Sequence, residues 1–144
     1  MTPQDRAIRC ADAMWATDTA SQALGMTITD IGPGTATLTM PVRADMLNGH
    51  GICHGGLIFT LADSAFAFAC NTYNALTVAQ SNQITYLAPG EADETLTATA
   101  VEVARQGRSG TYDVAVTGRG GRQIALFRGL SRTIPGQHFD EDKT

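Results

Sequence analysis

The fold of this chain is decided by the stretch His54-Gly55-Gly56-Leu57-Ile58-Phe59-Thr60-Leu61-Ala62-Asp63-Ser64-Ala65-Phe66-Ala67-Phe68-Ala69-Cys70-Asn71. Apolar side chains fall on nearly every side of a helix drawn through it, and a helix that is apolar all round is buried inside a domain. The same stretch carries one acid, Asp63. Burying a carboxylate is costly in free energy unless a partner satisfies it. The stretch therefore predicts a long central helix whose single acid either has a hydrogen-bonding partner or has a functional role.

Asp63 lies eight residues after Gly55, so it cannot cap the start of the helix. It is either a structural acid bonded to its neighbours or a functional one, since perturbed acids cluster at functional sites. The helix start favours function. Gly55 and Gly56 present backbone N–H groups at the positive end of the helix dipole, and glycine lets another molecule approach closely. An acid together with free N–H donors predicts a base or nucleophile beside an oxyanion-binding site.

Length and composition indicate one domain over residues 1–144, with 43% hydrophobic residues and a net charge of −4. The absence of a basic block argues against a nucleic-acid partner. The apolar run 57–70 is too short to span a membrane, and the N-terminus lacks the apolar core of a secretion signal. An odd number of cysteines, Cys10, Cys53 and Cys70, indicates a reducing compartment. We therefore expect a cytoplasmic protein with no membrane partner.

Hydrophobic periodicity predicts an amphipathic helix in the N-terminal region 1–24, from residue 4 onward. Alternating patterns predict two strands before the central helix and four after it. These strands are expected over residues 26–31, 35–42, 76–87, 94–105, 112–118 and 123–134. Six antiparallel strands must hide one apolar face, so an α+β fold is predicted in which the sheet wraps around the central helix. The polar tail 135–144 is expected to be mobile.

Three motifs carry a resemblance to a known family: Leu47-Asn48-Gly49-His50, Cys53-His54-Gly55-Gly56 and Leu61-Ala62-Asp63. They resemble the hotdog-fold acyl-CoA thioesterases of the PaaI type, a family associated with bacterial phenylacetate catabolism. The resemblance runs from about Arg6 to Ile134. It implies an antiparallel sheet around a central helix. It also implies a homodimer, often doubled to a homotetramer as a dimer of dimers, in which the acid of one subunit faces the glycine of the other.

The resemblance implies hydrolysis of aryl- or arylacetyl-CoA thioesters, of the phenylacetyl-CoA or hydroxyphenylacetyl-CoA class, to free acid and CoA. No separate cofactor is expected, because CoA is part of the substrate. The Gly55 N–H would polarise the thioester carbonyl. Asp63 would attack it as a nucleophile or deprotonate a water, and both routes require an ionised carboxylate.

Four further residues near the helix start or on the next strand are candidates. The resemblance implies that Asn48 orients the water or the carbonyl, although Asn-Gly is also a common turn pair. His54 fits either a hydrogen bond near the site or the fixing of its loop. Gly56 would bind substrate beside Gly55. Ser81 is the candidate for a hydroxyl that many family members carry on the strand after the helix; if Ala79 holds that place, the hydroxyl is absent.

The CoA phosphates need cationic partners, and Arg108, in the predicted turn 106–110, is the candidate, with Arg105 and Arg128 as further possibilities. Most single arginines are nevertheless solvated surface charges.

Competing hypotheses use the same residues. A zinc site would use His50, Cys53 and His54, but zinc sites need three or four ligands, and this segment is rich in glycine. A hotdog hydratase or dehydratase would pair His54 with Asp63. A non-catalytic acyl-CoA-binding module is the third alternative, and the presence of Asp63 argues against it.

Overall fold

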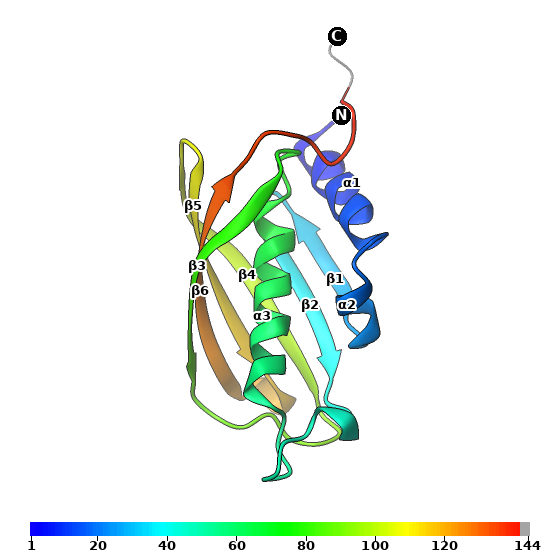
Figure 1. Cartoon of the computed structure of the whole chain (residues 1–144), viewed down its shortest axis with the longest axis vertical. Helices are drawn as coiled ribbons and strands as arrows, with labels where there is room; N and C mark the ends of the chain where they lie inside the picture. Colours follow the sequence, from blue (N-terminus) through cyan, green and yellow to red (C-terminus); the bar gives the residue numbers. More distant parts are fainter. Residues whose placement is uncertain (142–144) are drawn as a thin grey trace.

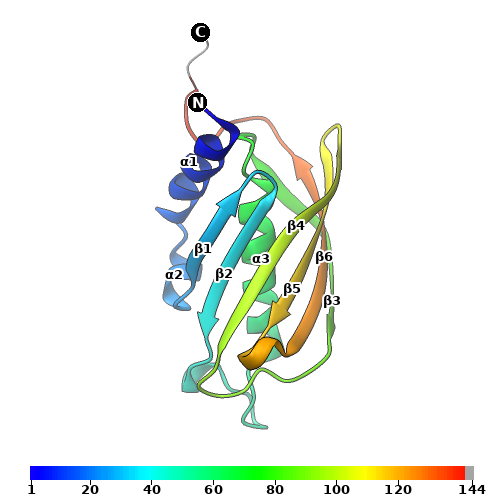
Figure 2. The ribbon, with the colours of Figure 1, turned by 180° about the vertical axis from the view of Figure 1, so that it is seen from behind.

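A computed structural model describes residues 1–141 of the chain. An antiparallel sheet curves around one long helix, and two shorter helices lie along one edge of the sheet (Figures 1 and 2). The elements in chain order are α1 (Pro3–Trp15), α2 (Thr19–Ala23), β1 (Thr27–Gly32), β2 (Thr35–Pro41), α3 (Gly55–Cys70), β3 (Thr77–Tyr86), β4 (Thr95–Gln106), β5 (Ser109–Thr117) and β6 (Gln123–Thr133). Two 3₁₀ turns, Ala44–Met46 and Arg119–Gly121, lie in the connections.

The six strands form one sheet in the order β1-β2-β4-β5-β6-β3, and all five pairings are antiparallel. The chain leaves β2 near one edge, crosses the sheet through α3, and returns as β3 at the opposite edge. The predicted α+β architecture, a six-stranded antiparallel sheet around a central helix, is confirmed. We call the sheet face that packs against α3 the inner face and the opposite one the outer face.

The core lies between α3 and the inner face. Leu61, Ala62 and Phe66 are fully buried, and the Phe66 ring lies 5.7 Å from Tyr112 and 5.8 Å from Phe127 between centroids. A Cβ on Gly129 would come within 2.8 Å of the Phe66 ring, so the β6 backbone approaches the helix at a position that only glycine fits.

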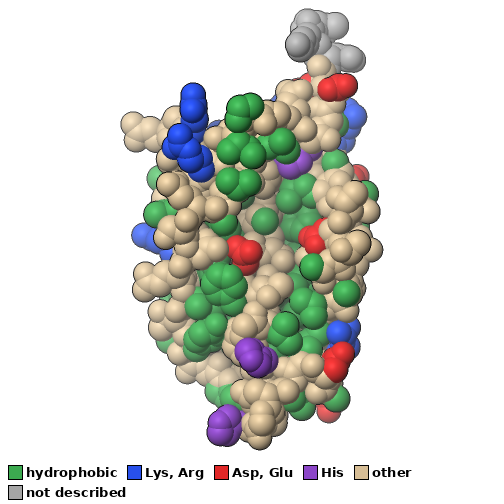
Figure 3. Space-filling view, viewed as in Figure 1, with side chains coloured by type: hydrophobic (Ala, Val, Ile, Leu, Met, Phe, Trp, Pro, Cys, Tyr) green, Lys and Arg blue, Asp and Glu red, His purple; other side chains and the backbone are tan. Residues whose placement is uncertain are grey.

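The apolar composition of α3 overstates its burial within one chain. Gly56 is exposed, and Thr60, Asp63 and Ala67 are only partly buried. Their spacing places them on one stripe of the helix, which faces away from the sheet. Figure 3 shows this face, where hydrophobic side chains gather on both sides of the helix. A single chain therefore leaves part of its central helix uncovered.

The N-terminal region contains two helices, not the predicted one. Asp18 breaks the pattern, because its carboxylate accepts a 3.0 Å hydrogen bond from the Ser21 N–H and caps a new helix. The strands lie within three residues of their predicted bounds. The largest difference is at β5, which begins at Ser109 because Gly107, with φ +61°, makes the preceding turn tight.

The tail from residue 135, expected to be mobile, has specific contacts in its described part. Glu141 forms a 2.8 Å ion pair with Arg6, and Arg9 lies 4.0 Å from the Phe139 ring centroid. These contacts join the tail to α1, which its polar composition did not predict. Residues 142–144 lie outside the described part. No helix within residues 1–141 has the length and apolar character that crossing a membrane requires.

Candidate active site

The start of α3 leaves one backbone N–H open. As the first helical residue, Gly55 has no intrahelical acceptor for its N–H, and none of residues 1–141 accepts from it. The Gly56 N–H, by contrast, donates to His54 Nδ1 at 2.9 Å. The Gly55 carbonyl accepts from the Tyr86 hydroxyl at 2.9 Å. Of the two predicted donors, Gly55 is the one that a ligand can reach, whereas the Gly56 N–H is already used.

His54 fixes the loop that precedes the helix. Its side chain is the N-cap of α3, and its own N–H donates to the Met46 carbonyl at 2.8 Å. A neutral ring that accepts at Nδ1 carries its proton on Nε2. Of the two roles that the sequence left open, these contacts show the fixing of the loop.

Asn48 combines a turn role with an open donor. Its Oδ1 accepts from the His50 N–H at 2.9 Å and the Ile52 N–H at 3.4 Å, as the Asn-Gly turn pattern indicates. Its Nδ2 has no acceptor within the described chain. Asn48 and Gly55 both line a cavity of about 370 Å³. The other lining residues are mostly apolar and come from Ile52, Cys53, Ile58 and the segment 86–89. The two residues with open donors therefore line the same cavity.

Asp63 lies in the middle of α3, half-buried on its uncovered stripe. Its Oδ1 accepts a 3.1 Å hydrogen bond from Asn82 Nδ2 on β3. Burial raises the pKa of Asp63, and the bond from Asn82, which acts in the opposite direction, does not cancel this. Eight residues of helix separate Asp63 from Gly55 by about 12 Å. One chain therefore does not bring the acid and the open N–H to the same carbonyl.

Ser81 lies on the wrong face of β3 to assist Asp63. It pairs with Leu130 on the outer face, whereas Asn82 pairs with Gly129 on the inner face. An irregularity between Ala79 and Ser81 shifts the register by one residue and places Ala79 opposite the buried Ser131. Neither Ala79 nor Asn82, the residues of this part of β3 that face α3, carries a hydroxyl. Asn82 is the one that contacts Asp63.

Arg108 is also distant from the open N–H of its own chain. It lies in the β4–β5 turn, at the opposite end of the molecule from the start of α3 (Figures 1 and 2). Within one protomer, the structure therefore gives no support to phosphate binding by Arg108. Arg105 stacks on Tyr73, 3.5 Å from its ring centroid, and Arg128 pairs with Asp113 at 2.7 Å.

Asn82 and Tyr86 are the site residues that sequence reasoning missed. With Ile84 they alternate on the inner face of β3, and that period-two pattern is visible in the sequence. What the sequence does not show is the bulge before Ser81, which decides which of two alternating sets faces the helix.

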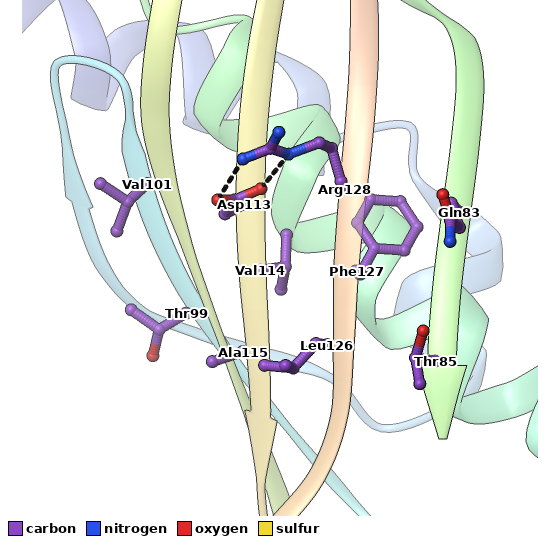
Figure 4. Close-up of a pocket in the computed structure, with 10 residues that line it drawn as sticks. All are labelled: Gln83, Thr85, Thr99, Val101, Asp113, Val114, Ala115, Leu126, Phe127 and Arg128. Atoms are coloured by element: carbon purple, nitrogen blue, oxygen red, sulfur yellow. Dashed lines mark hydrogen bonds and ion pairs between the residues drawn. The ribbon is translucent and has the colours of Figure 1, made fainter. Parts of the chain in front are cut away.

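A larger cavity lies elsewhere. It measures about 480 Å³ and is lined by residues of β3, β4, β5 and β6. Figure 4 shows its side chains, including Thr99, Val101 and the Asp113–Arg128 ion pair, on the outer face with α3 behind the sheet. The sheet separates this surface from both Gly55 and Asp63.

Residues 1–141 contain no group of three His, Cys, Asp or Glu side chains able to hold a metal ion. His54 Nδ1 is occupied by the Gly56 N–H, and burial raises the pKa of the Cys53 thiol above its ordinary value. A protonated thiol and an occupied imidazole nitrogen are poor metal ligands.

Comparison with known proteins identifies the family. The family model described as the thioesterase superfamily matches residues 50–125. The chain is 47% identical over 127 residues to the acyl-coenzyme A thioesterase PaaI of Escherichia coli, covering 88% of this chain and 90% of that protein. The chain belongs to the PaaI-type acyl-CoA thioesterases. These enzymes are hydrolases, and the hotdog fold expected from the resemblance is confirmed.

Solved structures agree with this assignment. The structure of the E. coli PaaI protein from the phenylacetic acid degradation operon superposes with a TM-score of 0.93 at 43% identity, covering 94% of this thioesterase and 99% of that chain. A hypothetical thioesterase of Streptococcus pneumoniae, solved with coenzyme A, matches with a TM-score of 0.78 at 25% identity, covering 88% and 97% of the two chains.

Proposed function

We propose that this thioesterase hydrolyses aryl- or arylacetyl-CoA esters of the phenylacetyl-CoA and hydroxyphenylacetyl-CoA class. The observation that carries the proposal is the open Gly55 N–H at the wall of a largely apolar cavity of about 370 Å³. An apolar pocket with a few polar groups is typical of a small-molecule site. The E. coli relative belongs to a phenylacetic acid degradation operon, and the pneumococcal relative binds coenzyme A. The cytoplasmic location stays a prediction.

Each proposed role follows from a contact or an open group. The Gly55 N–H, at the positive end of α3, polarises the thioester carbonyl. The Asn48 Nδ2, free of acceptors in the described chain and on the same cavity, holds the carbonyl or the water. Asp63 supplies the attacking oxygen, as a nucleophile or by deprotonating a water. Arg108 is retained only as a candidate for the CoA phosphates bound by an assembled enzyme.

A homodimer supplies what one chain lacks. Within residues 1–141, the edge strand β3 pairs with β6 alone, and α3 leaves a stripe uncovered beside it. Pairing two β3 strands about a two-fold axis extends the sheet and sets two α3 helices side by side in opposite directions. The Asp63 of each protomer then lies toward the partner's helix start, where the open N–H is located.

Doubling of the dimer to a homotetramer is supported by the outer face. Val101, Leu126 and Leu130 are 48%, 45% and 42% exposed there. Apolar patches of this kind on a sheet mark interaction surfaces, and a second dimer is the occupant that we propose.

The decisive experiment is release of free thiol from a panel of acyl-CoAs, with the wild type compared with Asp63→Asn at matched folding. The panel contains phenylacetyl, hydroxyphenylacetyl, benzoyl, short-chain and long-chain esters. We expect the aryl esters to be preferred and the variant to lose about 10²-fold or more in rate. Preference for long-chain esters would overturn the substrate assignment. Full activity of Asp63→Asn would overturn the catalytic one.

A further inference from the structure

Asn82 is the only side chain among residues 1–141 that donates a hydrogen bond to Asp63. An ionised carboxylate accepts and cannot donate, so the amide NH₂ of Asn82 must face it. This fixes the orientation of the amide group and turns Oδ1 away from Asp63. That Oδ1 is buried, and no donor reaches it in the described chain.

A buried carbonyl oxygen without a donor needs a physical reason. Most buried polar atoms in proteins are paired, and exceptions mark bound water or catalytic groups. Ile84, two residues further along the same face of β3, is apolar, so an apolar side chain is compatible with this surface. The amide at position 82 thus has its NH₂ group bonded to Asp63 and a buried oxygen that lacks a donor in the described chain.

We propose that Asn82 is a positioning residue that holds both the Asp63 carboxylate and the attacking water, so that Asp63 acts as a general base. The Nδ2 group directs Asp63, and Oδ1 accepts one hydrogen bond from a water whose other proton points to the carboxylate. This inference rests on the proposed hydrolysis at Asp63, and it decides between the two routes left open above.

The chemical step balances with water alone. The water oxygen attacks the thioester carbonyl carbon while Asp63 takes one of its protons, and the carbonyl electrons move onto the oxygen held by the Gly55 N–H of the other protomer in the proposed dimer. The tetrahedral intermediate then collapses, the C–S bond breaks, and its electron pair leaves on sulfur. The protonated Asp63 returns its proton to the thiolate. The products are the free carboxylic acid, which ionises in water, and CoA.

Few charges surround this pair. On α3 the titratable neighbour is Cys70, where burial raises the thiol pKa to about 12 and keeps it neutral. At the start of α2, the Asp18 carboxylate accepts a hydrogen bond from the Ser21 hydroxyl, which lies 3.3 Å from the Ser64 hydroxyl on α3. No cation from residues 1–141 forms an ion pair with Asp63. Burial is the main cause of the raised pKa of Asp63, and within the described chain Asn82 is the group whose hydrogen bond lowers it.

The first test needs no variant. Excess wild-type enzyme is mixed with phenylacetyl-CoA in oxygen-18-labelled water and quenched after one turnover. A general base transfers solvent oxygen directly, so the released acid carries the label and the enzyme does not. If the Asp63 peptide gains the label and the acid does not, Asp63 is a nucleophile and the proposal is wrong. Thiol release in the same reaction reports separately whether the enzyme is a hydrolase at all.

The second test compares Asn82→Leu and Asn82→Ser with Thr85→Val, which removes a polar group from the outer face of the same strand. We expect kcat of both Asn82 variants to fall roughly 10- to 100-fold with little change in KM. Their acid limb should move to higher pH, because the bond from Asn82 lowers the pKa of Asp63. Thr85→Val should match the wild type. A folded Asn82 variant with an unmoved acid limb and near wild-type kcat would overturn the role of Asn82.

Discussion

At the scale of single residues, Gly55→Pro tests the role of the Gly55 N–H, because it removes this donor and changes little else. Proline is favoured at the first helical position, and His54 has φ −59° and ψ 129°, the extended conformation that a following proline requires. A Cβ at position 55 would lie 3.4 Å from the Tyr86 ring, an ordinary contact. We expect Gly55→Pro to lower kcat about 10²- to 10³-fold with unchanged helix content by circular dichroism.

Gly55→Ala is the matched control for that variant, because it adds the same Cβ and keeps the N–H. Near wild-type activity in Gly55→Ala, beside a large loss in Gly55→Pro, assigns the effect to the donor. Equal losses in both variants would instead assign it to crowding against Tyr86, and the oxyanion role of Gly55 would be wrong.

We expect the ionised Asp63 carboxylate to lower the folding stability at neutral pH while it serves catalysis. Burial raises its folded-state pKa above the ordinary 3.8, so its contribution to stability is fully present below pH 3.8 and is lost as pH rises through the raised value. At pH 7 Asp63→Asn should therefore unfold at a higher urea concentration than the wild type. The difference should disappear in acid. A variant less stable than the wild type at pH 7 would show that the ionised carboxylate has a stabilising partner in the assembled enzyme.

At the scale of elements, Glu94 joins the start of β4 to the β5–β6 turn. Its carboxylate is 1% exposed and accepts from the Glu91 N–H at 2.6 Å, the Arg119 N–H at 2.7 Å and the Arg122 guanidinium at 2.7 Å. Burial by itself raises the pKa of Glu94, but these three bonds outweigh it and hold the value below the ordinary 4.5. The side chain thus links two connections that are distant in sequence.

The pH dependence of that link is predictable. Because the folded-state pKa lies below 4.5, its stabilisation is present above pH 4.5 and is lost as pH falls through the lowered value. We expect Glu94→Gln to reduce the free energy of unfolding at pH 7 by roughly 1–3 kcal/mol, with a smaller difference in acid. Urea titrations at both pH values measure this, with Glu91→Gln as the exposed control. A constant difference across pH would contradict an ionised role for Glu94.

The elements themselves were predictable where a periodic pattern runs long enough. The uniform apolar run of α3 and the alternation of the six strands gave their type and approximate bounds. The break at Asp18 was missed, because a local side-chain cap there overrides an otherwise continuous amphipathic pattern. The bulge before Ser81 depends on pairing with β6, which is tertiary information. Because of this bulge, the neighbour of Asp63 is Asn82 and not the predicted hydroxyl of Ser81.

At the scale of the whole molecule, the two halves of the proposed site lie about 12 Å apart along one helix. The sequence supplied both halves, Gly55 and Asp63, because each is visible as a residue type at a helical position. Their meeting in a dimer was expected only from the family resemblance, because no pattern within one chain encodes the partner that covers its open stripe. The catalytic unit that we propose is therefore the dimer.

Subunit complementation tests that unit directly. Gly55→Pro and Asp63→Asn are each expected to be inactive alone. When they are unfolded together and refolded in equal amounts, half of the dimers are mixed, and each mixed dimer has one site with both defects and one intact site. Activity should therefore return to about a quarter of the wild-type value. Native mass spectrometry verifies that mixed dimers form. If they form and remain inactive, Gly55 and Asp63 act within the same protomer, and the geometry of α3 would have to change on substrate binding.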